Sequence, residues 1–375
     1  MRAPQPRPVT RRTVLAGAFG ASALALLSGC DSLVKAAANS CPSDSAASGG
    51  VDWAPDVAHP VSHGINDLAK ATPTTPGGPP RDMLVLYPSA DTNPTDAAIL
   101  ELCLTPWPVV YFLHGQPPSG QPYVGYHRKW TQYAAILASS GYVVVVPNHE
   151  AQLPDSPEGY DDYIAEALAD LDWVRTKWTH SKWVNSQADA TVVAGHSYGA
   201  LLAARIAGAH PEFAAFVSLS GGYLELNDAV AAASVSRPSF FMWAVSDFDP
   251  YENISTNVVK LWDGLTQYKY SAVFPGEHFD YLAPADRGGV PSGPCPLIGA
   301  VAAELSALFI AENMPTPSSR TKIPINLTPP QVQLSTRQKD FTTGWMGGLS
   351  AFHADPDCHL QLRWNYDAQT GNRSL

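Results

Sequence analysis

The sequence lacks three features that would each indicate a class of protein. After residue 30 it contains no segment long and apolar enough to span a bilayer. Positive charge is scarce, with 23 Lys and Arg against 34 Asp and Glu, and none of the five cysteines forms a C-x-x-C pair. The acidic excess argues against binding to nucleic acid, whose phosphates would repel the chain. The missing C-x-x-C spacing argues against a zinc site.

The first 29 residues indicate an export signal instead of part of the fold. Thr10–Leu15 resembles a twin-arginine signal, Ala16–Leu27 is an apolar stretch too short for a comfortable membrane span, and Leu27–Cys30 resembles a lipobox. We therefore expect cleavage before Cys30 and lipidation of that cysteine, which would anchor the protein to a membrane of the bacterial cell envelope, outside the cytoplasm. The alternative is an uncleaved signal anchor. Removing residues 1–29 takes away four arginines and no acidic residue, so the net charge of −11 becomes −15.

The remaining cysteines suggest disulfides. Once Cys30 is assigned to lipid, the chain retains Cys41, Cys103, Cys295 and Cys358. An even number in an exported protein predicts two disulfides, and four cysteines allow three pairings. We favour Cys41–Cys103 with Cys295–Cys358, because each bond would join a terminal arm to the body of the chain.

Composition divides the chain into four parts. After the signal, residues 30–50 are rich in Ala, Ser and Gly, as expected of a flexible tether. Residues 51–313 form one domain in which apolar runs alternate with helical segments. Residues 314–375 change character, being rich in Pro, Thr and Ser, and we expect them to extend around the core.

The alternation predicts the fold class. Continuous apolar strands between helices are typical of an α/β fold, with a mostly parallel central sheet and helices on both of its faces. The expected strands are residues 83–87, 108–113, 142–146, 191–194, 215–219, 239–245 and 270–274, with a further strand at 359–364. The expected helices are residues 128–139, 160–178, 198–209, 254–265 and 298–310.

The most informative motif is G-x-S-x-G at residues 195–199, placed between a β-branched run and an alanine-rich helix. A serine at such a sharp strand-to-helix turn projects its hydroxyl away from the backbone. The two glycines are needed because a side chain there would collide with the neighbouring strand or helix. Ser197 is therefore the candidate nucleophile. The alternative is a glycine-rich turn whose serine only caps the helix.

A serine needs a base to remove its proton, and His278 is the best candidate. It lies in a loop directly after the expected strand at 270–274. That loop should open at the same edge of a parallel sheet as the serine turn. His114 and His196 flank glycine turns and are better suited to shaping loops, and His149 could line a pocket.

The base in turn needs an orienting carboxylate. Asp247 directly follows the expected strand at 239–245, and the chain order of serine, acid and histidine fits this architecture. Asp249 is the rival acid, although Pro250 would tend to turn it aside. Glu225, after the preceding strand, is a third candidate.

An acyl-transfer site also needs two backbone N–H donors for the developing oxyanion. The residue after the nucleophile, Tyr198, should supply one of them. The second should come from the loop after the strand at 108–113. Because Pro117 and Pro118 carry no N–H, Gln116 is the natural donor there.

Together these segments resemble the α/β-hydrolase fold across residues 80–312. Within it, they resemble the compact branch that contains dienelactone-hydrolase-like esterases, cutinase-like polyester hydrolases, chlorophyllases and platelet-activating-factor acetylhydrolases. The residues that carry the resemblance are HG at 114–115, SGYVVVVPNHE at 140–150, GHSYG at 195–199, SD at 246–247 and GEHFD at 276–280.

Two departures narrow this resemblance. The acetylhydrolases place their acid after the strand that follows the elbow helix, and residues 218–222 contain no carboxylate. The acid at Asp247 instead follows the pattern of dienelactone hydrolases and cutinase-like enzymes. The HGGG signature of another lipase branch is also absent.

The resemblance implies a serine-dependent carboxylic ester hydrolase that acts through an acyl-enzyme on extracytoplasmic esters, without metal or organic cofactor. Alternatives are a phospholipase- or acetylhydrolase-like lipid esterase, an acyltransferase or peptidase, and a non-catalytic binding lipoprotein. The identity of the ester and the oligomeric state stay open. Candidate pocket residues are aromatic: Tyr123, Tyr126, Trp130, Trp243, Phe248 and Tyr251.

Overall fold

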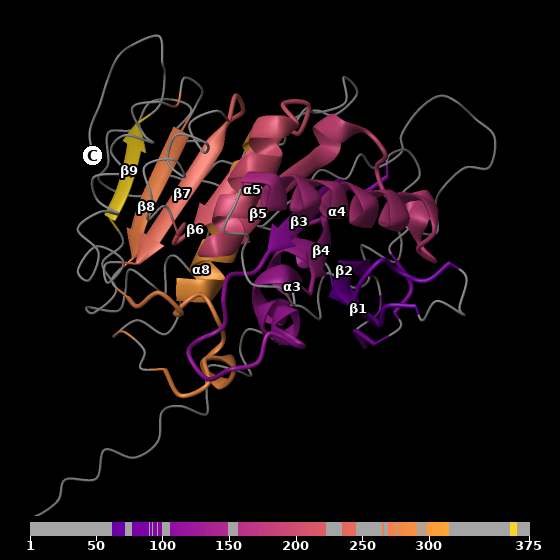
Figure 1. The fold of residues 1–375 in the computed structure, drawn as a ribbon, viewed down its shortest axis with the longest axis horizontal. Coiled ribbons are helices and arrows are strands. Elements are labelled where there is room, and N and C mark those ends of the chain that lie inside the picture. Colours follow the sequence, from indigo (N-terminus) through magenta and orange to yellow (C-terminus); the bar gives the residue numbers. More distant parts are fainter. Residues whose placement is uncertain are drawn as a thin grey trace, which may run out of the picture.

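In the computed structural model, nine strands of the described residues form one mixed sheet (Figure 1). The structure describes residues 62–71, 77–89, 91, 93–95, 97–99, 106–148, 157–222, 235–244, 265, 269–274, 276–290, 293, 298–314 and 361–365. Across the sheet, the strands follow the order β1-β2-β4-β3-β5-β6-β7-β8-β9. Their bounds are β1 Ser62–Leu68, β2 Met83–Ser89, β3 Val109–Leu113, β4 Val143–Pro147, β5 Thr191–His196, β6 Ala215–Leu219, β7 Ser239–Ala244, β8 Lys269–Phe274 and β9 Gln361–Asn365.

The six strands from β3 to β8 run parallel to one another. β1 and β2 add antiparallel strands at one end of the sheet, and β9 adds an antiparallel strand at the other. β3 lies between β4 and β5, so the chain proceeds to one side of β3 and then crosses to its other side. Loops after β3 and β5 therefore diverge at their carboxyl ends, which is where open α/β sheets form ligand crevices.

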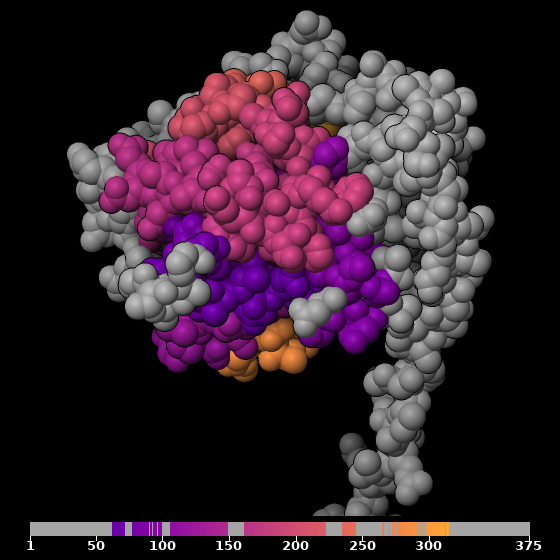
Figure 2. Space-filling model, turned by 90° about the vertical axis from the view of Figure 1, so that its right-hand side faces the viewer, coloured from indigo at the N-terminus to yellow at the C-terminus, as the bar shows by residue number. Residues whose placement is uncertain are grey.

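Helices cover both faces of the sheet, as the sequence predicts. They are α3 Thr131–Ser139, α4 Pro157–Thr176, α5 Tyr198–Ala209 and α8 Ile298–Asn313. Successive side chains of a strand point to opposite faces. Val110 and Phe112 of β3 pack in the core that contains α3 and α8, whereas Tyr111 and Leu113 pack in the core that contains α4 and α5. In Figure 2, which faces the β1 end, the indigo strands lie between α4 above and α8 below.

These observations confirm an α/β fold with a mainly parallel sheet. The expected strands agree with the observed ones to within a residue or two. Those from β2 to β7 are runs rich in β-branched and aromatic residues that are buried on both faces. The strand expected at residues 359–364 is β9, which pairs with β8. The helix expected at residues 254–265 falls outside the described residues, apart from Leu265.

Two elements differ from the sequence prediction. The expected helix at residues 128–139 is two elements, a 3-10 turn at Tyr126–Trp130 followed by α3 from Thr131. β1 was not expected, because Gly64, Asn66 and Asp67 are poor strand formers. Pairing of all seven β1 residues with β2 overrides that local preference.

At both antiparallel ends of the sheet, one end of the outermost strand lies at the amino-terminal edge of the parallel strands. In β1, Ser62 pairs with Ser89, the last residue of β2. In β9, Asn365 pairs with Lys269, the first residue of β8.

In the described part of the chain, no helix has the length and apolar character needed to cross a membrane.

Candidate active site

Ser197 occupies the turn between β5 and α5 in an unusual backbone conformation. Its φ of 55° and ψ of −124° lie in a region that costs a non-glycine residue about 1–3 kcal/mol. Hydrogen bonds with the end of β6 and with the segment just after it hold it there. The Ser197 N–H donates to the carbonyl of Leu219 at 2.9 Å, and its carbonyl accepts from the N–H of Gly222 at 3.0 Å.

The glycines around this turn allow two backbones to approach each other closely. A Cβ on Gly199 would overlap the backbone carbonyls of Leu113 and His114, at the end of β3. A Cβ on Gly115 would lie 2.6 Å from the Cβ of Ser197. The loop after β3 therefore packs directly against the serine turn, as the motif predicts.

The two predicted oxyanion donors belong to these same segments. Tyr198 is the first residue of α5, and Gln116 follows Gly115 in the loop after β3 and is half-buried. The amino end of a helix carries free N–H groups and a positive partial charge. The arrangement can therefore bind negative charge close to Ser197.

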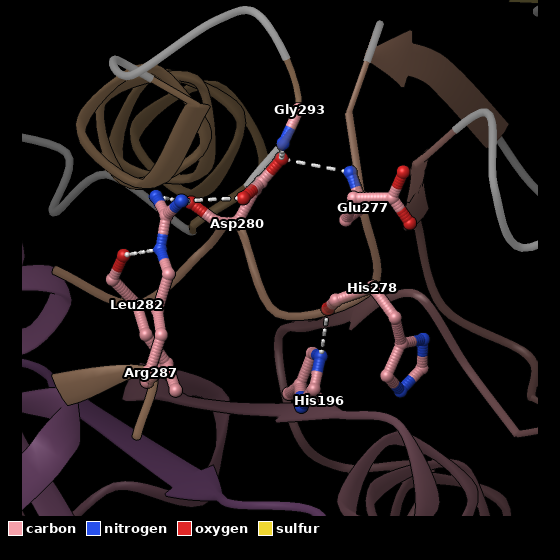
Figure 3. Close-up of polar contacts among 7 residues, drawn as sticks. All are labelled: His196, Glu277, His278, Asp280, Leu282, Arg287 and Gly293. Atoms are coloured by element: carbon pink, nitrogen blue, oxygen red, sulfur yellow. Dashed lines mark hydrogen bonds and ion pairs between the residues drawn. The ribbon is translucent and has the colours of Figure 1, made fainter. Parts of the chain in front are cut away.

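His278 reaches the serine turn from the loop after β8. We define residues 276–290 as the histidine loop. The Nε2 of His196, one residue before Ser197, donates to the carbonyl oxygen of His278 at 2.9 Å (Figure 3). The two rings lie 4.7 Å apart between centroids. His196 thus connects the serine turn to the histidine loop.

The two other histidines at this edge have structural contacts. Because a carbonyl only accepts, Nε2 carries the proton of neutral His196. Burial holds the pKa of His196 well below its usual range. Burial likewise lowers the pKa of His114 to about 4, and its Nδ1 donates to the carbonyl of Gly115 at 2.8 Å. Both therefore shape loops, as the sequence suggests.

The three predicted acids, Asp247, Asp249 and Glu225, fall outside the described residues. Residues 220–222, which follow β6, contain no carboxylate. Asp280 lies two residues after His278, but its carboxylate is directed away from the His278 ring (Figure 3). It pairs instead with the guanidinium of Arg287, with 2.5 Å between Oδ1 and Nη1.

The structure separates the predicted pocket aromatics. Tyr123 is half-buried, and both burial and the nearby Tyr198 raise its pKa, which places the two phenols within electrostatic reach of each other. Three others are instead core side chains with exposures of 1% or less: Tyr126, Trp130 and Trp243. Large apolar rings gain more from full burial than from lining an open pocket. Phe248 and Tyr251 fall outside the described residues.

Two connections at this edge were not predicted. Ser220, after β6, has a positive φ of 43°, and its hydroxyl donates to the Tyr281 hydroxyl at 3.1 Å. Asp280 and Arg287 form a buried ion pair. The sequence signals neither, because both depend on contacts between residues whose spacing follows no motif.

Other predicted sites are not seen. Cys30, Cys41, Cys103, Cys295 and Cys358 all fall outside the described residues. Within the described ranges, no cluster of three or more His, Cys, Asp or Glu is arranged to hold a metal ion. The chain matches no protein-family model and no curated protein.

Proposed function

We propose that the protein is a serine-dependent carboxylic ester hydrolase with the α/β-hydrolase fold. The observation that carries the proposal is the conformation of Ser197. A serine with positive φ, between a parallel strand and the amino end of a helix, is strained by about 1–3 kcal/mol. Strain of that size is retained where the geometry of a side chain serves chemistry.

The proposed reaction is a two-step acyl transfer. His278 takes the proton of the Ser197 hydroxyl as Oγ bonds to the ester carbonyl carbon, and the carbonyl oxygen becomes an oxyanion. The N–H groups of Gln116 and Tyr198 are the proposed donors to that oxyanion. The intermediate collapses, its carbon–oxygen bond to the alcohol breaks, and the departing alkoxide takes the proton from His278. A water molecule, deprotonated by His278, then releases the acid and regenerates Ser197.

Asp247 remains the proposed acid. It follows Ala244, the last residue of β7, and β7 neighbours β6, which binds the backbone of the serine turn. A carboxylate there would lie at the same edge of the parallel sheet as Ser197 and His278. We further propose, from the sequence alone, that a lipid at Cys30 anchors the enzyme outside the cytoplasmic membrane and that its substrates are extracytoplasmic esters.

The test combines turnover with labelling of the full-length protein. A series of p-nitrophenyl esters of increasing acyl length is assayed with the wild type and with Ser197→Ala. We expect the variant to lose at least about 10³-fold in kcat. A fluorophosphonate probe should add one label to the wild type, detected by intact mass, and none to Ser197→Ala.

Ser218→Ala is the matched control. Ser218 is a buried serine in β6 that pairs with Gly195, so it lies beside the turn without belonging to it. This variant should keep its label and most of its activity. If the wild type is neither labelled nor faster than Ser197→Ala on any ester, the proposal fails. Labelling without ester turnover would indicate an acyltransferase or peptidase.

A further inference from the structure

The histidine loop contains a charge pair that the proposed mechanism does not use. Side-chain exposure is 0% for Asp280 and 3% for Arg287, so both charges have left water. Burying two ions is costly unless their geometry is good and their remaining polar atoms find partners. Both conditions are met here.

Every side-chain nitrogen and oxygen atom of this pair has a partner in the histidine loop or at Gly293. Oδ1 of Asp280 accepts from Nη1 of Arg287 at 2.5 Å. Oδ2 accepts from the N–H of Glu277 at 2.7 Å and from the N–H of Gly293 at 2.9 Å. Nε of Arg287 donates to the Leu282 carbonyl at 3.0 Å, and Nη2 donates to the Asp280 carbonyl at 3.2 Å (Figure 3).

These hydrogen bonds hold backbone groups on both sides of His278 in the chain. The Asp280 carboxylate accepts from the N–H of Glu277, the residue before the histidine, and Arg287 donates to the carbonyls of Asp280 and Leu282, two and four residues after it. A third contact, from His196, fixes the His278 carbonyl itself. The backbone of His278 is therefore held on both sides, and its ring is directed away from the pair (Figure 3).

We propose that Asp280 and Arg287 are positioning residues, which fix the backbone of the histidine loop so that the His278 ring meets the hydroxyl of Ser197. The inference rests on the proposed hydrolase function. A displacement of about 1 Å in a catalytic group can cost about 100-fold in rate. A fixed loop avoids that loss without any contact between the pair and the substrate.

Two variants of the full-length protein test the proposal. Arg287→Lys keeps the charge but loses the planar fork that reaches three oxygens. Asp280→Asn keeps the shape but turns an amide group toward the guanidinium or toward the two N–H donors. We expect each folded variant to lose roughly 10- to 100-fold in kcat for a p-nitrophenyl ester, with KM little changed. We also expect a shift in the pH at which kcat/KM is half-maximal.

Arg81→Lys is the matched control, because Arg81 also pairs with a fully buried aspartate, Asp170, in another part of the protein. It should leave kcat and the pH profile close to those of the wild type. Circular dichroism at the assay temperature verifies that each variant is folded. If the histidine-loop variants do not fold, Gly293→Ala replaces them. Its Cβ would lie 2.7 Å from the Cα of Gly276 and 2.9 Å from Oδ2 of Asp280, so it would displace the histidine loop and the carboxylate without removing a charge.

The outcomes separate this proposal from the function on which it rests. Loss of kcat in folded variants, with the control unaffected, supports positioning. Folded variants with the kcat and pH profile of the wild type overturn it, even if their thermal stability is lower. An inactive, unlabelled wild type would instead contradict the hydrolase function.

Discussion

The backbone strain at Ser197 has a consequence for stability that can be separated from the proposed catalytic role. Glycine adopts φ of 55° and ψ of −124° freely, whereas alanine retains the Cβ that makes this conformation costly. Both substitutions remove the hydroxyl.

We therefore expect Ser197→Gly to be more stable than Ser197→Ala by about 1 kcal/mol, after the larger entropy of unfolded glycine is subtracted from the relieved strain. Urea unfolding of the two proteins at the same pH measures the difference. Equal midpoints and slopes would mean that the turn holds no such strain.

His114 should make the protein sensitive to acid. Its pKa falls from 6.5 to about 4 on folding, because burial disfavours the charged ring. The unfolded chain therefore binds the proton first as the pH falls. The stabilisation is complete above pH 6.5 and is lost as the pH approaches 4.

Between pH 7.5 and pH 4, the wild type should lose about 3 kcal/mol more free energy of unfolding than His114→Asn. The pKa of His196 is shifted in the same direction, mainly by burial, and His196 is present in both proteins, so most of its own effect cancels in the comparison. Denaturant titrations of both proteins at the two pH values provide the four free energies. Parallel losses in the two proteins would contradict the assignment.

At the scale of elements, β9 pairs with the side of β8 that faces away from β7. Backbone groups of Lys269–Val273 pair with Gln361–Asn365 of β9. A strand left unpaired presents a row of free N–H and C=O groups, to which another copy of the chain can bind.

A chain that ends at Met314 lacks β9 and should aggregate faster than one that ends at Asn365. Light scattering at equal concentration measures this difference. Arg363→Pro, which removes one backbone N–H within β9, should give an intermediate rate in the full-length chain. A truncated protein as monodisperse as its control would show that β9 does not protect this edge.

Elements were predictable in proportion to their burial. β3 and β4 are continuous apolar runs, so composition and length suffice to identify them. β1 was missed because its stability comes from pairing with β2, which no local pattern encodes.

The candidate site was predictable where close packing of the backbone demands a particular residue type. The turn at Ser197 requires glycine at positions where no Cβ fits, and that requirement is visible in the sequence. Trp130 and Trp243 were assigned to the pocket although they are core residues, because hydrophobicity does not distinguish the two locations. The partner of Asp280 could not be inferred either, since Arg287 contacts it across an irregular loop.

At the scale of the whole molecule, the register of the two outermost strands sets the orientation in which the protein would be presented on a support. Ser62 at the start of β1 and Asn365 at the end of β9 both lie at the amino-terminal edge of the parallel strands, opposite the edge that carries Ser197. If the protein is immobilised on a bead or fused to another protein, attachment beside either residue would direct the serine edge toward the solution. The order β1 to β9 also separates these points by eight strand spacings of about 4.8 Å, or roughly 40 Å. Two dyes at these points would thus report, by energy transfer, whether the sheet is intact.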